Sequence, residues 1–259
     1  MGFLKNLFTV KDDKGSAKKF NLRECKFKNE QYFLSELSRI DKWQDTDEED
    51  DKQYLLTNKN LLPSHYSSKF SLQLQKVKVM YSLGMSIQNI QTQFIKSLPN
   101  FFKGWGENDE SYADMVDAVS LSVLLDAPEN YFDEFVMLLN KINNRNEKEI
   151  WKPDAFLDIL LSYKIKDREI SKDLIVPSKY KKLVDIFYKK NDEAEEMIKE
   201  YLEDWYKLND DMPWFDTHKR QWGFSGYWAW DIAAIVKLKQ LDDVHIKTLN
   251  FYPKDFMQL

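Results

Sequence analysis

The chain has 259 residues, 43% of them hydrophobic, and only seven glycines and seven prolines. This length accommodates one large domain or two of ordinary size, and the low glycine and proline content favours an all-α fold of packed α-hairpins in two helical subdomains. The formal net charge of −5 argues against a protein that binds DNA or an anionic membrane over its whole surface, and it favours a basic partner.

The first part of the chain predicts a lead-in, a helix and an acidic loop. Residues 1–26 mix Lys, Asp, Gly and Ser without periodicity, and we expect them to be loosely ordered. Helical spacing begins near Phe27 and continues through Leu37 and Ile40. A dense acidic run follows, which we expect to form a solvated loop. Its members are Asp45, Asp47, Glu48, Glu49, Asp50 and Asp51.

Two further helices are predicted to form a tight hairpin. The apolar stripe over 70–81 lies on one helical face, and Gly84 is placed to stop that helix. Ser86 can cap the next helix, whose stripe runs to Leu98 and which we expect Pro99 to end.

More helices are predicted after the loop 103–110, over 112–123 and, behind Pro128, over 131–142. We therefore assign residues 27–143 to an N-terminal helical domain, because the polar stretch 143–148 is a plausible boundary.

Residues 150–259 form the predicted C-terminal helical domain. Helices are expected over 156–163, around 183–187 and over 194–205, and an acidic loop with aromatic residues follows at 209–216. The stretch 226–235 is an aromatic-rich helix start with one acid, Asp231, in its apolar face.

The carboxylate of Asp231 is four residues from both Tyr227 and Ile235, so a helix would bury it. Because an unpaired buried charge is costly, we expect a cation from the segment 218–220 (His218, Lys219 or Arg220) to pair with it. This structural interpretation is favoured over the alternative of an acid that lines an inhibitory groove.

The residue pattern gives little support to an enzyme, a metal site or a cofactor site. The three histidines are far apart, Cys25 has no cysteine partner for a disulfide, and no glycine-rich phosphate loop follows a strand. The N-terminus does not read as a signal peptide and no membrane span is predicted, so we expect a cytoplasmic protein.

Two motifs stand out in the C-terminal quarter, Phe224 to Trp228 and the Tyr-Pro-x-Asp element that begins at Tyr252. In these motifs the chain resembles the PoNi family, the polymorphic nuclease immunity proteins, and the resemblance spans nearly the whole chain. Asp231 stands where the family is expected to have Glu, and Phe-Tyr-Pro-Lys-Asp replaces a Tyr-Tyr-Pro-Tyr-Asp type. The signature positions are Tyr227, Trp228, Asp231, Tyr252, Pro253 and Asp255.

The resemblance implies an all-α immunity protein that neutralises a cognate secreted bacterial DNase toxin of the PD-(D/E)xK superfamily by stoichiometric binding. It implies no direct contact with nucleic acid or membrane. Such toxins travel through contact-dependent secretion systems, whereas the immunity protein stays in the producing cell. A helical adaptor that binds a peptide or protein in a groove between hairpins is the alternative.

Acids with nearby aromatic side chains are the candidate toxin-binding residues, because a DNase presents a cationic surface to DNA and aromatic residues often anchor interfaces. The acidic run at 45–51 is a secondary candidate, since a merely solvated, partly disordered run is the favoured interpretation. The primary candidates are Trp105, Glu107, Asp109, Glu110, Asp210, Asp211, Trp214 and Asp216.

Overall fold

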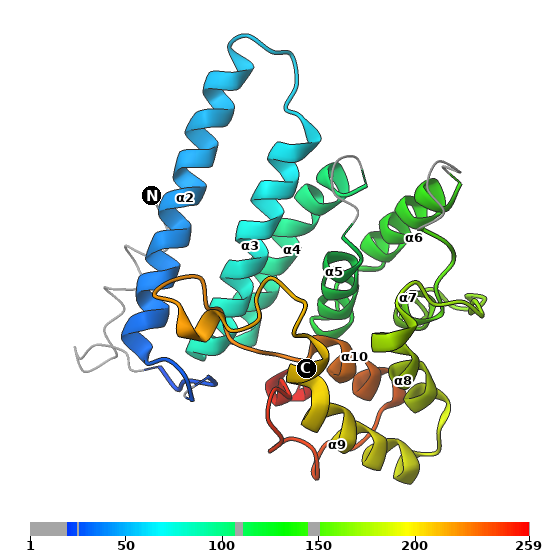
Figure 1. The fold of residues 1–259 in the computed structure, drawn as a ribbon. Helices are drawn as coiled ribbons and strands as arrows, with labels where there is room; N and C mark the ends of the chain where they lie inside the picture. Colours follow the sequence, from blue (N-terminus) through cyan, green and yellow to red (C-terminus); the bar gives the residue numbers. More distant parts are fainter. Residues whose placement is uncertain (1–19, 25, 107–110, 145–150, 259) are drawn as a thin grey trace. The chain divides into compact units, whose positions relative to one another are not determined.

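The computed structural model describes residues 20–24, 26–106, 111–144 and 151–258 (Figure 1). Within these ranges the regular structure is helical and contains no β-strand, which confirms the predicted all-α class. The α-helices are α2 (Glu30–Leu55), α3 (Pro63–Leu83), α4 (Ile87–Gly104), α5 (Tyr112–Leu124), α6 (Glu129–Asn143), α7 (Ala155–Leu161), α8 (Pro177–Tyr188), α9 (Asn191–Leu208) and α10 (Trp230–Lys239), with short 3-10 helices η1 (Thr217–Lys219) and η2 (Lys254–Gln258).

The chain divides into two compact units that are not continuous in sequence. Unit 1 comprises residues 1–104 and 216–226, and unit 2 comprises 105–215 and 227–259. The helices α5 and α6 thus belong to unit 2, whereas the sequence prediction assigned them to an N-terminal domain that ends at 143.

Unit 1 is built on α3, which packs against both α2 and α4. Asn29 caps the start of α2 by accepting a hydrogen bond from the backbone of Tyr32. The predicted stop at Gly84 is confirmed: this residue has φ of 88°, and a Cβ there would lie 2.0 Å from the backbone oxygen of Asn21. A side chain at residue 84 is therefore excluded by both conformation and space. Residues 216–226 return to this unit, where Phe224 is fully buried.

Two local predictions about unit 1 are wrong. The acidic run at 45–51 is not a loop, because it forms the second half of α2. Its inward positions contact α3, where Asp51 pairs with His65 and Lys69, so tertiary partners outweigh the high local charge. Pro99 also lies inside α4 rather than at its end, and Phe101 beyond it is buried against Phe70 with ring centroids 4.8 Å apart.

Unit 2 is centred on α5, whose residues from Met115 to Leu124 are almost all buried. Both α7 and α10 pack on α5, and α8 packs on α7, α9 and α10. The predicted helices over 156–163 and 194–205 correspond to α7 and α9. In the part of the chain that the structure describes, no helix is long and apolar enough to cross a membrane.

Candidate functional site

The acids of α2 present an exposed, unpaired charge cluster. Asp45, Glu48, Glu49 and Asp50 are exposed, and within the described residues no ion pair reaches any of them or the half-buried Asp47. Successive acids one helical turn apart repel one another, at a cost of about 0.2–0.5 kcal/mol per pair. The charges on this face of α2 therefore do not stabilise the fold.

The pKa values of Asp51 and Asp47, two acids of α2, shift in opposite directions. Burial opposes the charge of Asp51, but hydrogen bonds from Lys69 and His65 outweigh it and lower the pKa of that carboxyl. The Nδ1 atom of His65 lies 2.7 Å from Oδ1 of Asp51. At Asp47, burial and the neighbouring charges of Asp51 and Asp50 raise the pKa instead. Only the inward acid is neutralised by cations.

Large apolar side chains border the same acids. Trp43 is 50% exposed and Leu56 is 76% exposed, and Leu55 and Leu62 are also exposed. The guanidinium of Arg39 lies over the ring of Trp43, 4.1 Å from its centroid. We call this set the acidic hairpin surface. It comprises Trp43, Asp45, Glu48, Glu49, Asp50, Leu55, Leu56 and Leu62.

The predicted site around residue 105 has a buried aromatic residue. Trp105 is only 4% exposed, donates from Nε1 to the backbone oxygen of Ser111 at 3.1 Å, and packs edge-on against Trp151. Its side chain thus contributes to the core of unit 2 and offers little area to a partner. The predicted acids of this segment lie outside the described residues; they are Glu107, Asp109 and Glu110.

The predicted loop at 209–216 is confirmed as irregular, but its acids are mostly neutralised. Asp211 pairs with Lys179 at 2.5 Å, and Asp216 pairs with Lys219 at 2.6 Å. Asp210 is exposed and makes no ion pair within the described residues. Trp214 is half-buried and stacks on Trp205 with ring centroids 5.3 Å apart. Asp216 belongs to unit 1 and the other three candidates to unit 2, so the boundary between the two units falls inside this loop.

The family-like signature of the C-terminal quarter is structural in this fold. The helix α10 begins at Trp230, so Tyr227 precedes it, and Tyr227 and Tyr252 are both buried. The prediction that a cation pairs with Asp231 is wrong. The side chain of Asp231 instead accepts a hydrogen bond from the hydroxyl of Tyr201 at 2.8 Å. Because burial outweighs this hydrogen bond, the pKa of Asp231 rises to about 6. A neutral phenol satisfies the carboxylate without cancelling its charge.

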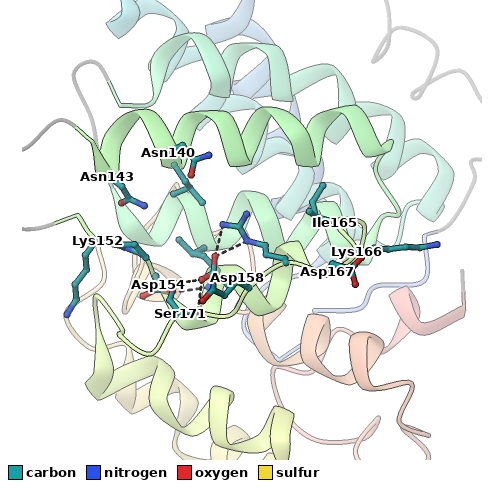
Figure 2. Close-up of a pocket in the computed structure, with 14 residues that line it drawn as sticks. Asn140, Asn143, Lys152, Asp154, Asp158, Ile165, Lys166, Asp167 and Ser171 are labelled. Carbon is teal, nitrogen blue, oxygen red and sulfur yellow. Dashed lines mark hydrogen bonds and ion pairs between the residues drawn. The ribbon is translucent and has the colours of Figure 1, made fainter.

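A polar pocket in unit 2 has a cavity volume of about 450 Å³ and lies beside α7 (Figure 2). Asp154 at its floor caps α7 by accepting from the backbone of Leu157 at 3.0 Å, and it accepts from the Tyr112 hydroxyl at 2.9 Å and the Ile175 backbone at 2.7 Å. Burial raises the pKa of Asp154 despite these donors. The carboxylate thereby fastens the segment after α7 to α5 and α7.

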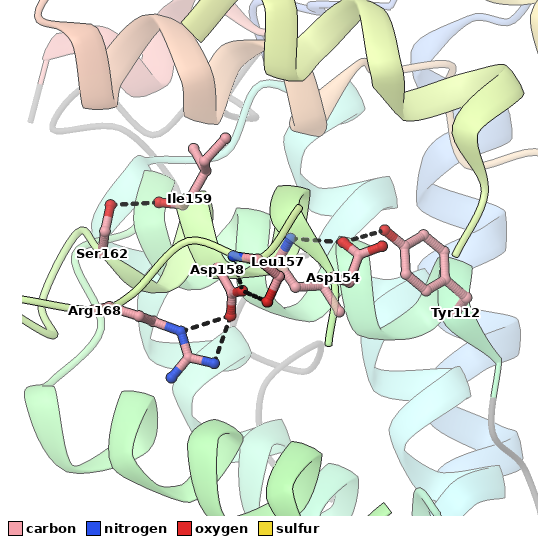
Figure 3. A network of polar contacts seen from close by, with 8 residues as sticks. Tyr112, Asp154, Leu157, Asp158, Ile159, Ser162 and Arg168 are labelled. Carbon is pink, nitrogen blue, oxygen red and sulfur yellow. Dashed lines mark hydrogen bonds and ion pairs between the residues drawn. The ribbon is translucent and has the colours of Figure 1, made fainter. Parts of the chain in front are cut away.

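Asp158 performs a similar task one helical turn later (Figure 3). It is 4% exposed and accepts from Nε of Arg168 at 2.8 Å, with the second guanidinium nitrogen at 2.6 Å. Its other oxygen accepts from the backbone and hydroxyl of Ser171. Because both oxygens are occupied, Asp158 orders the loop that leads to α8.

The pocket is not arranged for catalysis or for anion binding. Its two buried carboxylates, Asp154 and Asp158, are saturated by donors, and Figure 2 shows Lys152 and Lys166 at opposite ends with their side chains directed away from the centre. In the described ranges, no group of three or more His, Cys, Asp or Glu residues could hold a metal ion. Sequence reasoning missed this network, although Asp154 before the apolar run 155–161 carries the signal of a helix cap.

Comparison with known proteins matches nearly the whole chain to one family. Residues 17–137 match the model described as PoNe immunity protein (PoNi), N-terminal, and residues 152–256 match PoNe immunity proteins (PoNi), C-terminal. No curated protein matches the chain. The crystal structure of protein PA2201 from Pseudomonas aeruginosa is similar in fold, with a TM-score of 0.65, 13% sequence identity, and coverage of 93% of this chain and 91% of that one.

Proposed function

The chain belongs to the PoNe immunity protein (PoNi) family, and from this membership we propose that it blocks one cognate PoNe nuclease by stoichiometric binding over the DNA-binding surface of that toxin. The observation that carries the proposal is the pair of family matches, which together span most of the chain in the expected order. We assign the toxin to the PD-(D/E)xK superfamily and the site of protection to the cytoplasm of the producing bacterium.

Electrostatics supports occlusion as the way of inhibition. A nuclease binds the phosphate backbone with cationic side chains, and an acidic protein competes for that same surface. Close charge pairs at comparable interfaces have coupling energies of about 1.5–7 kcal/mol, enough to dominate affinity. The formal charge of −5 and the exposed acids of α2 and of the loop at 209–216 fit this role.

Direct protection tests the proposal. The cognate nuclease is expressed in a susceptible bacterium with or without this chain, and DNA integrity and survival are measured. We expect full protection, and continued DNA degradation in the presence of the chain would refute the proposal. An unrelated basic nuclease serves as the control, because its activity should be unaffected.

A titration separates occlusion from other ways of protection. Purified nuclease is mixed with increasing amounts of the chain, and plasmid cleavage and DNA binding by a catalytically inactive nuclease variant are both measured. Occlusion predicts that both signals are lost together at a molar ratio of one to one. If the inhibited toxin still bound DNA, the inhibitor would act outside the DNA-binding surface.

The same titration tests the loop at 209–216. Its predicted contact residues Asp210, Asp211, Trp214 and Asp216 differ in exposure and pairing. Reversal of the three acids to lysine is expected to weaken inhibition if the loop contacts the toxin. Unchanged affinity would remove the loop from the interface and leave the proposed inhibition intact.

A further inference from the structure

Exposed apolar side chains are concentrated on the hairpin of α2 and α3. Of the nine large hydrophobic residues that are exposed in the described part of the chain, four lie between residues 43 and 62. They are Trp43, Leu55, Leu56 and Leu62. Single exposed apolar residues are normal on a protein surface, but a local group of them is typical of an interaction site.

The side chain of Trp43 is preorganised for contact with a partner. Arg39 lies one turn earlier on α2, stacks over the Trp43 ring, and is itself held by Glu36 at 2.5 Å. The indole is thus half exposed but restrained on one face, so its ordering on binding costs little. Tryptophan is one of the residue types enriched at interface hot spots, and preorganisation lowers the cost of binding.

The helix that carries this surface is fixed from beneath. Lys76 of α3 pairs with Asp41 at 2.6 Å, and His65 and Lys69 hold Asp51, which lies further along α2. A binding surface on a helix that is fixed in this way loses little entropy when a partner docks.

Charge selects the kind of partner. Residues 41–62 contain seven acids and three lysines, and the exposed acids lie in sequence between Trp43 and the three exposed leucines. A second copy of this chain would bring the same negative charge, and a nucleic acid or an anionic membrane would also be repelled. A cationic protein surface is complementary to both the acids and the apolar group.

We propose that the acidic hairpin surface is the docking site for the cationic DNA-binding face of the cognate nuclease, with Trp43 and Leu56 as its apolar anchors. The proposal rests on the inhibitory function given above and assigns it a surface. The exposed acids of α2 meet the arginines and lysines that otherwise contact DNA phosphates, and the two anchors fill the apolar parts of that face between them.

The test measures binding of the full-length chain to a catalytically inactive variant of the nuclease by calorimetry at two salt concentrations. The charge-reversed variant Glu48→Lys, Glu49→Lys, Asp50→Lys is expected to lose about 100-fold in affinity and to show a weaker dependence on salt. The variant Trp43→Ala, Leu56→Ala is expected to lose about 30-fold.

Matched controls come from α6 and α8. Glu129→Lys, Asp133→Lys, Glu134→Lys makes the same change in charge at exposed positions, and Met137→Ala, Tyr188→Ala removes two similarly exposed apolar side chains. Both controls should bind within about threefold of the unaltered chain. Thermal unfolding followed by circular dichroism verifies that every variant is folded.

The outcomes separate this inference from the proposed function. Near-normal binding by both hairpin variants, or equal losses in the matched controls, would overturn the inference while the unaltered chain still inhibits. Loss only on reversal of Asp210, Asp211 and Asp216 would do the same and favour the other loop. Failure of the unaltered chain to bind the nuclease would refute the proposed function itself.

Discussion

The carboxylates at the start of α7 and those in the second half of α2 lie in opposite surroundings. Asp154 and Asp158 are buried and accept hydrogen bonds on every oxygen, whereas Glu48, Glu49 and Asp50 are exposed and have no ion pair within the described residues. Burial makes a charge expensive unless donors surround it, while exposure makes it cheap and leaves its field available. The first set therefore maintains the fold, and the second set is available to a partner.

The largest loss of stability is expected on substitution of Asp154. Replacement by alanine leaves the Tyr112 hydroxyl and the backbone N–H groups of Leu157 and Ile175 without their acceptor. Each such loss costs about 1–3 kcal/mol, so we expect the free energy of unfolding in urea to fall by about 4 kcal/mol. The exposed Asp210→Ala serves as the control. A loss below about 1 kcal/mol for Asp154→Ala would show that water replaces the carboxylate.

The ion pair of Asp158 is expected to have the next largest effect. Arg168→Ala leaves this buried carboxylate with only the Ser171 donors, and we expect a loss of about 3 kcal/mol. The double variant with Asp158→Asn should recover part of the loss, because the uncompensated charge is then absent. Additive losses in this double-mutant cycle would mean that the two side chains do not interact.

The carboxylate of Asp231 is intermediate between these two sets of acids. It is shielded from solvent, but no cation among the described residues pairs with it. Its pKa rises from 3.8 to about 6 in the folded chain because burial disfavours the charge. Below about pH 4 both states are protonated and the full stability is present, and between pH 4 and 6 the unfolded state loses its proton first. Stability is therefore lost over this window as the pH rises.

Asp231→Asn removes this loss while it retains an acceptor for the Tyr201 hydroxyl. We expect the variant to be about 3 kcal/mol more stable than the unaltered chain at pH 7 and close to it in stability near pH 4, as measured by urea unfolding at both values. Tyr201→Phe is the companion variant, and it should lower stability at pH 7. A variant that is less stable than the unaltered chain at pH 7 would contradict the pKa assignment.

Sequence patterns predicted the features that depend on local chemistry. The stop at Gly84 depends on a left-handed conformation, and the cap at Ser86 depends on its own hydroxyl, which accepts from the backbone of Asn89. Both signals lie within a few residues of the feature that they specify. The apolar stripes of α7 and α9 were likewise sufficient to place those helices.

The features that failed depend on partners distant in sequence. The residues near Asp51 in the sequence do not indicate its contact with Lys69, so the acidic run was predicted as a loop. The residues near Asp231 likewise do not indicate its contact with Tyr201, so the wrong partner was expected for this acid. Trp105 and Trp214 looked equally suited to an interface, yet contacts with Trp151 and Trp205 occupy their rings. Trp43 likewise stands beside acids in the sequence, but its exposure follows from the packing of α2 on α3.

Neutralisation of the exposed acids of α2 is expected to have the smallest effect on stability. This effect shows whether these acids are free to contact a partner. Neutralisation by Glu48→Gln, Glu49→Gln, Asp50→Asn removes like charges at helical spacing, so stability should stay within about 0.5 kcal/mol of the unaltered chain or rise slightly. Added salt should diminish even this difference, because it screens the repulsion between exposed acids. If neutralisation instead cost more than about 1 kcal/mol, these acids would be paired within the fold, and their availability to a cationic partner would be lost.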